Sequence, residues 1–444
     1  MSVKPTIDTS SALFTCRTAL MAAMALIASV AGRDAIAAWE ITPQASAGIV
    51  YEDNARFQNN NEDDATGAVL DGRVDLTWLD ERTDLTLTPR GRFSFYTDSD
   101  DEDLEDDDLY LDFRSTRRTL KSEFGLTAGW SDVAVRTSEL ASAVPDNPDE
   151  PPPAESDSTD TRFINDSRER WYVRPFLTYE LSPRNRISAQ IAYSDVSYDR
   201  AGTGRRPFDN LTWTITGERV LNERNSVSLE IYGSQFNSDD VVLGVDNQTD
   251  TYGANLIYSR AISETLTAAL TLGGSTSDFE ITRTPDIGDQ CLDLDDQGNL
   301  IIVSCRFEDD DSNFIGNISL RKRGQRTVMN FDLGRSIYPS SGGLTVVTDT
   351  VRFYINRSMT QLWSTRFGVL AYQEETNGNL TNRDIDYVRA DVSLIRRLSE
   401  RWSVSGRYQY TWRDSNEGGP GFDGTASRNA VFVEIVYRGI GHRF

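Results

Sequence analysis

The chain has 444 residues and a formal net charge of −24, with 26% charged and 38% hydrophobic residues. So acidic a protein has no electrostatic attraction for nucleic acid, and no nucleic-acid partner is expected. Beyond the N-terminal segment, no apolar run approaches the roughly 18 residues of a transmembrane helix, which excludes a helical membrane domain. Aromatic residues nevertheless make up 10% of the chain, which indicates that the protein covers an apolar surface.

The N-terminus has the organisation of a secretory signal peptide. Residues 1–17 are polar, residues 18–32 form an apolar run, and "AIAA" at 35–38 offers a cleavage site of the A-x-A type. A membrane anchor is the alternative, but the run is short for a membrane span. We therefore predict that 1–37 is a signal peptide removed on export and that 38–444 form the mature domain.

The mature chain alternates apolar and polar residues with a period of two. In "AVLDGRVDLTW" (68–78), Leu70 and Trp78 share one face while Asp71 and Arg73 share the other. This period is typical of β-strands, because a helix would mix the two sets of residues. About 18 such segments follow one another, with predicted spans of 41–52, 67–79, 83–97, 108–116, 121–135, 168–181, 186–198, 209–219, 226–236, 250–260, 265–278, 312–322, 326–336, 346–357, 363–374, 383–395, 401–412 and 428–444.

Short and long connections alternate along the chain. Turns such as 80–82 and 182–185 are each followed, one strand later, by long loops such as 98–107 and 199–208. Transmembrane β-barrels sort their connections in this way, with short periplasmic turns and long outer loops. The predicted fold is therefore all-β: a transmembrane antiparallel β-barrel of about 18 strands in the bacterial outer membrane.

The predicted outer loops are acidic. The run "DSDDEDLEDDD" (98–108) has nine acidic residues in eleven, and 145–160 combines proline with aspartate and glutamate. Solvated loops commonly have this composition. The functional alternative is that divalent cations bridge these loops to lipopolysaccharide, and we expect outer-membrane lipid and lipopolysaccharide as partners.

Two cysteines of the mature chain bracket a predicted hairpin in an outer loop. A turn at 296–299 would place Cys291 opposite Cys305, because the register that forms the turn also aligns these two positions. In an exported protein such a pair is predicted to form a disulfide, here one that braces the loop.

Catalytic and metal-binding chemistry find little support in the residues present. His442 is the only histidine, and membrane barrels that hydrolyse bonds generally use a histidine base. No histidine or cysteine cluster is available for a transition metal, and no glycine-rich phosphate loop occurs. We expect no enzyme activity, no metal and no cofactor.

The polar face of the strands predicts the lining of the lumen. Arginine and tyrosine recur on this face, and their guanidinium and hydroxyl groups suit sugars rich in hydroxyl and carboxylate groups. They equally suit the wet wall of any pore. The predicted lumen-lining residues are Arg73, Arg90, Arg92, Arg114, Arg170, Arg174, Arg352, Arg366, Arg389, Arg407, Tyr172, Tyr354 and Tyr372.

The first mature segment carries a family resemblance. "WEITPQASAGIVYEDNARF" (39–57) resembles the start of the β-barrel porin 2 family of outer-membrane proteins, in which a proline, an alternating strand and a Tyr-x-Asp-Asn element recur. The matching residues here are Pro43, Tyr51, Asp53 and Asn54. Members of that family often accompany exopolysaccharide or capsule systems, so the resemblance implies an outer-membrane pore for a secreted polysaccharide.

The C-terminal run resembles the signal that the outer-membrane barrel assembly machinery reads. Tyr437, Gly439, Ile440 and the terminal Phe444 match its alternating pattern, whereas His442 stands where the pattern prefers an aromatic or apolar residue. We expect this last strand to close the barrel against the first, because an unpaired strand edge in lipid is very costly.

Three functions fit these features. The first is export of an exopolysaccharide or capsule polymer through the lumen, with a separate periplasmic polysaccharide-export protein as partner. The second is a general or solute-specific diffusion porin. The third is a structural surface barrel closed inside by loops such as 136–167.

Overall fold

The computed structural model describes most of the chain between Ala38 and Arg443. The described residues are 38–57, 59, 64–97, 106–135, 166–199, 206–240, 245–283, 291–294, 300–303, 305–339, 345–376, 384–416 and 424–443. The predicted signal peptide 1–37, the acidic segment 145–160 and the terminal Phe444 lie outside them. Within the described ranges, no helix is long and apolar enough to cross a membrane.

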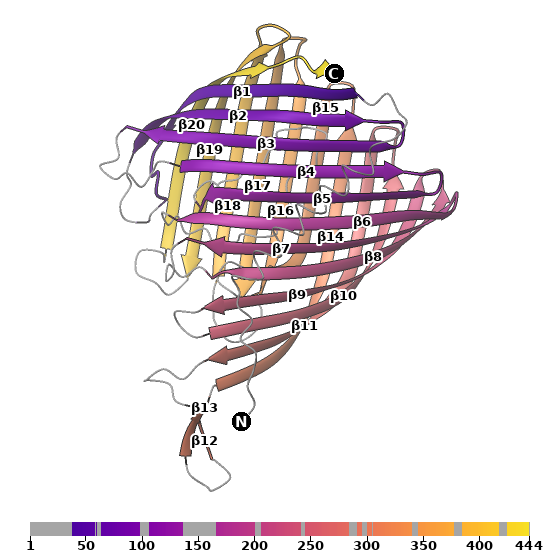
Figure 1. The fold of residues 1–444 in the computed structure, drawn as a ribbon, viewed down its shortest axis with the longest axis vertical. Helices are drawn as coiled ribbons and strands as arrows, with labels where there is room; N and C mark the ends of the chain where they lie inside the picture. Colours follow the sequence, from indigo (N-terminus) through magenta and orange to yellow (C-terminus); the bar gives the residue numbers. More distant parts are fainter. Residues whose placement is uncertain are drawn as a thin grey trace.

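Eighteen long antiparallel strands form one closed sheet (Figure 1). Strands that are neighbours in the chain are neighbours in the sheet, and β1 pairs with β20 as well as β2, which closes the ring. Closure leaves no unpaired edge for lipid to face. The long strands are β1 (Ala38–Glu52), β2 (Ala65–Leu79), β3 (Thr83–Tyr96), β4 (Asp106–Arg118), β5 (Ser122–Ala134), β6 (Ser167–Ser182), β7 (Asn185–Tyr198), β8 (Phe208–Asn222), β9 (Asn225–Asp240), β10 (Val245–Ala261), β11 (Leu266–Arg283), β14 (Cys305–Arg323), β15 (Thr327–Pro339), β16 (Thr345–Ser358), β17 (Trp363–Thr376), β18 (Asp384–Arg397), β19 (Trp402–Asn416) and β20 (Gly424–Arg438).

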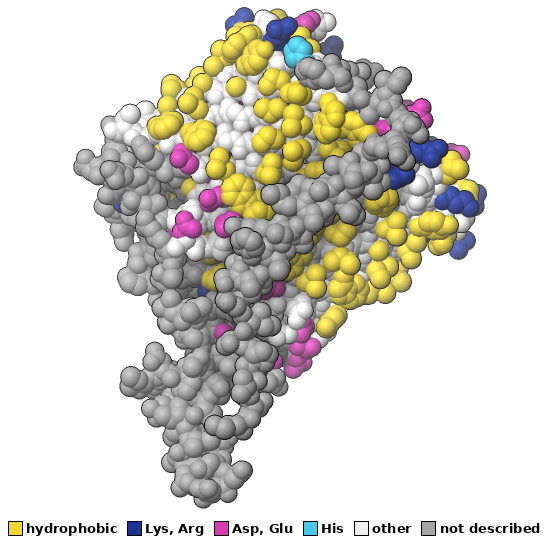
Figure 2. All heavy atoms as spheres, viewed as in Figure 1, with side chains coloured by type: hydrophobic (Ala, Val, Ile, Leu, Met, Phe, Trp, Pro, Cys, Tyr) yellow, Lys and Arg dark blue, Asp and Glu magenta, His cyan; other side chains and the backbone are white. Residues whose placement is uncertain are grey.

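The outer face of the barrel is apolar over much of its height. Large hydrophobic side chains there are exposed, including Ile49 at 63%, Ile191 at 52% and Phe314 at 60%. Figure 2 shows such side chains, in yellow, gathered over the viewed face. Soluble proteins rarely expose so much contiguous apolar surface, whereas the lipid-facing side of a transmembrane barrel consists of it.

The two rims of the barrel differ in charge. Lys and Arg side chains, such as the exposed Lys322 and Arg326 at the turn between β14 and β15, gather at the rim formed by the short turns (Figure 2). Toward the long loops, the outer face instead becomes acidic: Asp195 lies opposite Asp209, and Asp250 lies opposite Asp278. The apolar zone therefore ends before the strands do, and the strands continue beyond it with polar outer faces.

The predicted strand count, order and alternation are confirmed. Several strands nevertheless extend further toward the long loops than predicted: β14 begins at Cys305 rather than 312, and β11 ends at Arg283 rather than 278. In that extension Asp278 lies opposite Asp310. The alternation continues there with its faces exchanged, because Phe279 and Ile281 are buried on the inner face while Asp278 and Glu280 lie on the outer face. The apolar residues of the extension therefore do not mark a lipid-facing side.

The hairpin predicted between the two cysteines is present, but in a different register. It consists of β12 (Cys291–Leu294) and β13 (Leu300–Val303), and Cys291 lies opposite Val303. Cys305 instead begins β14, opposite Arg283. The predicted alignment of Cys291 with Cys305 is therefore wrong by two residues, because β13 ends before Cys305 and β14 pairs with β11. The disulfide itself stays a prediction, since the two side chains lie outside the described part of the structure.

Candidate functional site on the inner wall

The register of the sheet identifies the side chains that face inward. Residues opposite each other in an antiparallel ladder point to the same side, and Ile49, Leu70 and Phe93 are exposed on the outer face. By this alternation, all thirteen Arg and Tyr residues predicted to line the lumen lie on the inner face. They fall into two arcs on either side of β1: Arg73, Arg90, Arg92, Arg114, Arg170, Tyr172 and Arg174 on β2–β6, and Arg352, Tyr354, Arg366, Tyr372, Arg389 and Arg407 on β16–β19.

In the first arc, arginines stack on tyrosine rings. The guanidinium of Arg90 lies 5.3 Å from the ring centre of Tyr110 and also bonds Asp71, with an N···O distance of 2.7 Å. Arg170 and Arg174 lie on the Tyr172 ring, each 5.1 Å from its centre. Stacking of this kind fixes the position of a guanidinium while leaving its N–H groups available to other acceptors.

The Tyr172 ring is itself held against the wall. Its hydroxyl donates a hydrogen bond of 2.6 Å to Asp112 on β4. Between them lies Gly129 on β5, where a Cβ would be only 2.5 Å from the Tyr172 ring. The glycine therefore allows the ring to lie along the wall, because any larger residue would push it into the lumen.

At mid-height, one row of opposed residues carries two arginines. Arg114 lies opposite Thr127, and Thr127 lies opposite Arg174. The two arginines are two strands apart, roughly 10 Å. Among the residues that the structure describes, neither forms an ion pair with a carboxylate, and the same holds for Arg92. This row is the part of the wall best suited to bind an anionic group.

The arginines at the end of the second arc are paired within the wall. Asp391 accepts hydrogen bonds from the Nε atoms of Arg389, at 3.2 Å, and of Arg407, at 3.1 Å. Gln409 accepts from the Nη2 atoms of the same two arginines, at 3.0 and 2.7 Å. The side chains of Arg389 and Asp391 are 1% and 0% exposed. These two arginines therefore stabilise the wall, and they are poorly placed to bind a solute.

Tyr354 and Tyr372, also in the second arc, take part in packing. Tyr354 is fully buried. The Tyr372 ring stacks on Tyr387 of the neighbouring strand, with ring centres 4.8 Å apart.

The two arcs therefore differ in part of their members. In the first arc Arg73 pairs with Asp75 and Arg90 pairs with Asp71, whereas Arg114 and Arg174 have no carboxylate partner within the described residues. In the second arc Arg389 and Arg407 are both bonded to Asp391 and Gln409.

The ring closes where β20 pairs with β1, and we call this pair of strands the seam. At the long-loop end of the seam, side chains bond the two strands on both faces of the sheet. On the inner face, Arg428 Nη2 lies 2.5 Å from Glu52 Oε1, and both side chains are almost fully buried. Beyond the end of β1, the Asp53 carboxylate accepts hydrogen bonds from the backbone N–H of Asn429 and, at 2.7 Å, from its Nδ2. Asp53, known from the sequence only through the family resemblance, therefore joins the first long strand to the last.

Immediately after the seam, the chain turns into the barrel through residues 53–57, which we call the inner strap. Asn54 and Phe57 both have a φ of 52°, and Asn54 Nδ2 donates to the backbone oxygen of Ser427 at 3.0 Å. Asparagine tolerates such a φ better than most residues, which explains its use at the turn.

Phe57 anchors the end of the inner strap. Its side chain is 1% exposed and packs on Leu370, Tyr387 and Ala426, which are inward-facing residues of β17, β18 and β20. The Arg413 guanidinium lies 5.1 Å from the centre of its ring. Sequence reasoning missed this contact, although an aromatic residue five positions after the end of the first strand was a usable signal.

The C-terminal residues are arranged around the first strand. The Tyr437 ring faces outward, 4.9 Å from the Trp402 ring. The Gly439 N–H donates to the Pro43 oxygen at 2.7 Å, and a Cβ at Gly439 would lie 2.6 Å from the proline ring. Glycine is thus required where the last strand passes the proline of the first.

The pairing resumes after this glycine in a shifted register. Ile440 is 52% exposed, and the short strand β21 (His442–Arg443) places His442 opposite Ile41 at the short-turn rim, where Figure 2 shows the histidine in cyan. The assembly-signal resemblance stays a prediction, since Phe444 lies outside the described residues.

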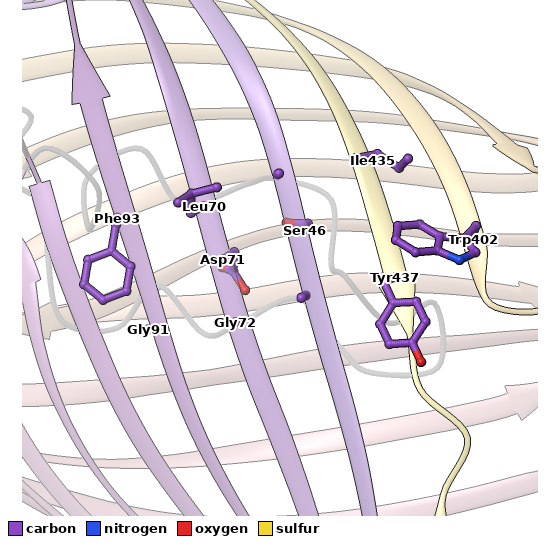
Figure 3. A pocket seen from close by; sticks show the side chains of 11 residues that line it. Ser46, Leu70, Asp71, Gly72, Gly91, Phe93, Trp402, Ile435 and Tyr437 are labelled. Carbon is purple, nitrogen blue, oxygen red and sulfur yellow. The ribbon is translucent and has the colours of Figure 1, made fainter.

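A hollow of about 640 Å³ opens on the outer face next to the seam (Figure 3). Its floor consists of small residues, including Ala45 opposite Gly72 and Gly72 opposite Gly91. Trp402 and Tyr437 line it toward β19 and β20, while Leu70 and Phe93 line it toward β2 and β3. Because the hollow lies within the apolar zone, it faces membrane lipid rather than the lumen.

A closed ring of eighteen strands, with an apolar outer face and a polar inner face, defines a bacterial outer-membrane β-barrel. No family model and no curated protein matches the sequence. Among solved structures, similarity extends to the ferric-catecholate import receptor Fiu of Escherichia coli K12 (TM-score 0.45, 9% identity, 90% of this chain and 81% of that chain). Similarity also extends to Pseudomonas aeruginosa OccK2, solved in complex with glucuronate (TM-score 0.42, 10% identity, 90% of this chain and 98% of that chain). A further similar structure is Acinetobacter baumannii OccAB2 (TM-score 0.42, 10% identity, 91% of this chain and 98% of that chain). At such identities and TM-scores, none of their ligands transfers to this chain.

Proposed function

We propose that the protein is an outer-membrane pore for the export of a secreted polysaccharide. The observation that carries the proposal is the mid-height row of Arg114, Thr127 and Arg174, with the stacked Tyr172 directly above it. Guanidinium groups without carboxylate partners attract acidic groups, and the hydroxyl of Thr127 between them offers a hydrogen bond to a sugar. Repeated weak contacts of this kind suit a polymer that must move along the wall without being retained.

The family resemblance of the first strand supports the same proposal. Among the residues on which the resemblance rests, Pro43 and Asp53 bond the last strand, and Asn54 forms the turn of the inner strap. A separate periplasmic export protein would then deliver the polymer to the short-turn rim, whose Lys and Arg side chains suit an acidic partner surface.

The first experiment is genetic. Deletion of the gene should abolish surface polymer while polymer accumulates in the periplasm, and the wild-type gene should restore export. The double variant Arg114→Gln, Arg174→Gln should restore less export than wild type. Arg117→Gln, a loss of charge on the outer side of β4, should restore it fully. Unchanged surface polymer in the deletion strain would refute the proposal.

A second experiment separates export from passive diffusion of solutes, which the same polar wall would also allow. The purified barrel is inserted into a planar bilayer, and its conductance and ion selectivity are measured. Conductance without any polymer phenotype would identify a diffusion porin. Absence of both would identify a closed structural barrel. With either pore function, loss of Arg114 and Arg174 should shift selectivity toward cations.

A further inference from the structure

A second hollow, of about 390 Å³, lies on the inner wall in the half nearer the short turns. Two rows of opposed residues from β6 to β9 build it. The upper row runs from Phe176 through Gln190 to Thr214, and the lower row runs from Thr178 through Ser188 and Thr216 to Glu230. The hollow begins two residues below Arg174 on the same strand, at the edge of the arginine-rich arc.

Phe176 forms the apolar part of this hollow. On the neighbouring strand, a Cβ at Gly125 would lie 2.5 Å from the Phe176 ring, so the ring leans over the glycine along the wall. Tyr172 leans over Gly129 in the same way. The two rings are four residues apart on β6, a distance of roughly 13 Å. Their glycine partners keep both rings close to the wall instead of projecting into the lumen.

The polar side chains of the hollow have few hydrogen-bond partners in the protein. Thr178, Ser188, Gln190 and Thr214 make no side-chain hydrogen bond to any residue within the described part of the chain. In the first arc above, by contrast, Tyr172 and Arg90 are bonded to aspartates. Hydroxyl and amide groups that line one hollow without protein partners are available to bind a ligand.

Glu230 is the one charged group in the hollow, and its position is fixed. Its Oε1 accepts a hydrogen bond from Asn255 Nδ2 at 2.8 Å, and its Oε2 accepts a longer one, at 3.5 Å, from Thr216. A fixed carboxylate accepts hydrogen bonds from hydroxyl groups and repels other carboxylates. The hollow therefore disfavours an acidic ligand group, unlike the arginine row next to it.

A neutral sugar ring has the matching chemistry. One face of a pyranose presents C–H groups that stack on an aromatic ring, and its edge presents hydroxyls that both donate and accept hydrogen bonds. We propose that Phe176, Thr178, Ser188, Gln190, Thr216 and Glu230 form a subsite for a neutral pyranose unit of the polymer. The role of this subsite in transport rests on the pore function proposed above, but the binding of a sugar to it can be measured without transport.

The test is a titration of the purified full-length mature barrel in a zwitterionic detergent, because a detergent with a sugar headgroup would compete. The probes are maltohexaose and cellotetraose, which are α- and β-linked, and saturation-transfer NMR reports binding. A polyethylene glycol of similar length has neither a ring face nor hydroxyls along its chain, and it serves as the control ligand. At least one sugar should bind saturably, and the glycol should not.

The variants then locate the site. Phe176→Ala should weaken binding roughly tenfold, Phe176→Tyr should retain it, and Phe432→Ala, which removes an inward-facing phenylalanine on β20, should leave it unchanged. The double variant Thr178→Val, Thr216→Val removes two hydroxyls at nearly constant volume and should also weaken binding. Each variant is first checked for the heat-sensitive electrophoretic mobility of a folded barrel.

The possible outcomes distinguish the two proposals. If neither sugar binds the wild type, or if Phe176→Ala binds as well as Phe432→Ala does, the subsite proposal is overturned even where export is confirmed. If the purified barrel binds sugar saturably and this binding depends on Phe176, while deletion of the gene leaves surface polymer unchanged, the subsite is established and the export function is overturned. If Phe176→Ala loses its folded mobility, the Thr178 and Thr216 variant decides the question.

Discussion

Glu52 and Arg428 form a buried ion pair across the seam at which the barrel closes, with Oε1 and Nη2 2.5 Å apart. Both side chains are at most 3% exposed. Removing one partner of such a pair leaves the other charge buried, at a cost of about 3–5 kcal/mol. The last strand is thus held to the first by side chains as well as by the backbone ladder.

Glu52→Gln should therefore destabilise the barrel by several kcal/mol, lowering the temperature at which it loses its folded mobility in an unheated detergent gel. Glu81→Gln removes a carboxylate from an exposed position in a short turn and should have almost no effect. Equal melting temperatures for Glu52→Gln and wild type would show that the seam does not depend on this pair.

Phe57→Ala should release the inner strap. The ring is fully buried against three strands, so its loss should cost about 3–5 kcal/mol locally. Because the strap occupies space inside the barrel mouth, its release should also raise single-channel conductance. Phe95→Ala truncates an exposed phenylalanine on the outer face and provides the matched control. Unaltered conductance and stability in Phe57→Ala would contradict the anchoring role.

The assignment of inner and outer faces predicts opposite effects at two adjacent residues. Leu272 is 47% exposed on the outer face, while Thr271 points inward. Arginine on the lipid face costs about 2–4 kcal/mol near the bilayer centre, whereas the polar lumen accepts it. Leu272→Arg should therefore lower the free energy of unfolding in lipid vesicles and Thr271→Arg should leave it nearly unchanged. If Thr271→Arg destabilised the barrel more than Leu272→Arg, the assignment of the lipid-facing and lumen-facing sides would be wrong.

The disulfide between Cys291 and Cys305 is predicted despite the altered hairpin register. Mass spectrometry of the protein isolated from outer membranes without reductant should find a peptide pair linked through these cysteines. Two free thiols would refute the prediction.

Deletion of Phe444 tests the assembly signal. The shortened protein should accumulate unassembled in the periplasm or be degraded, whereas His442→Phe, which brings the run closer to the pattern, should assemble normally. Normal insertion of the protein without Phe444 would show that the resemblance is misleading. Fractionation of membranes and the folded gel mobility measure both results.

Strand identity was predictable because alternation in sequence reports directly which residues face lipid, as in Leu70 and Phe93. The ends of the strands were less predictable, because beyond Asp278 the apolar residues Phe279 and Ile281 face inward instead of toward lipid. The arginines on the inner face were also predictable by parity. Which of these arginines have a carboxylate partner was not predictable. Arg389 has one and Arg114 has none within the described residues, because the register of the strands decides which side chains are neighbours.

The pairing of Glu40 with Arg443 brings the start of the first strand and the end of the last to the same rim. The order of strands in this molecule is consequently circular, and the covalent break between β20 and β1 is one of several positions at which such a ring could be opened. Circular permutants that join these two ends with a short linker and begin in a long loop would keep every inter-strand pair. The contact between β20 and β1 would then lie within one hairpin of continuous chain, so that the effect of the Glu52–Arg428 pair on assembly could be separated from that of the chain ends.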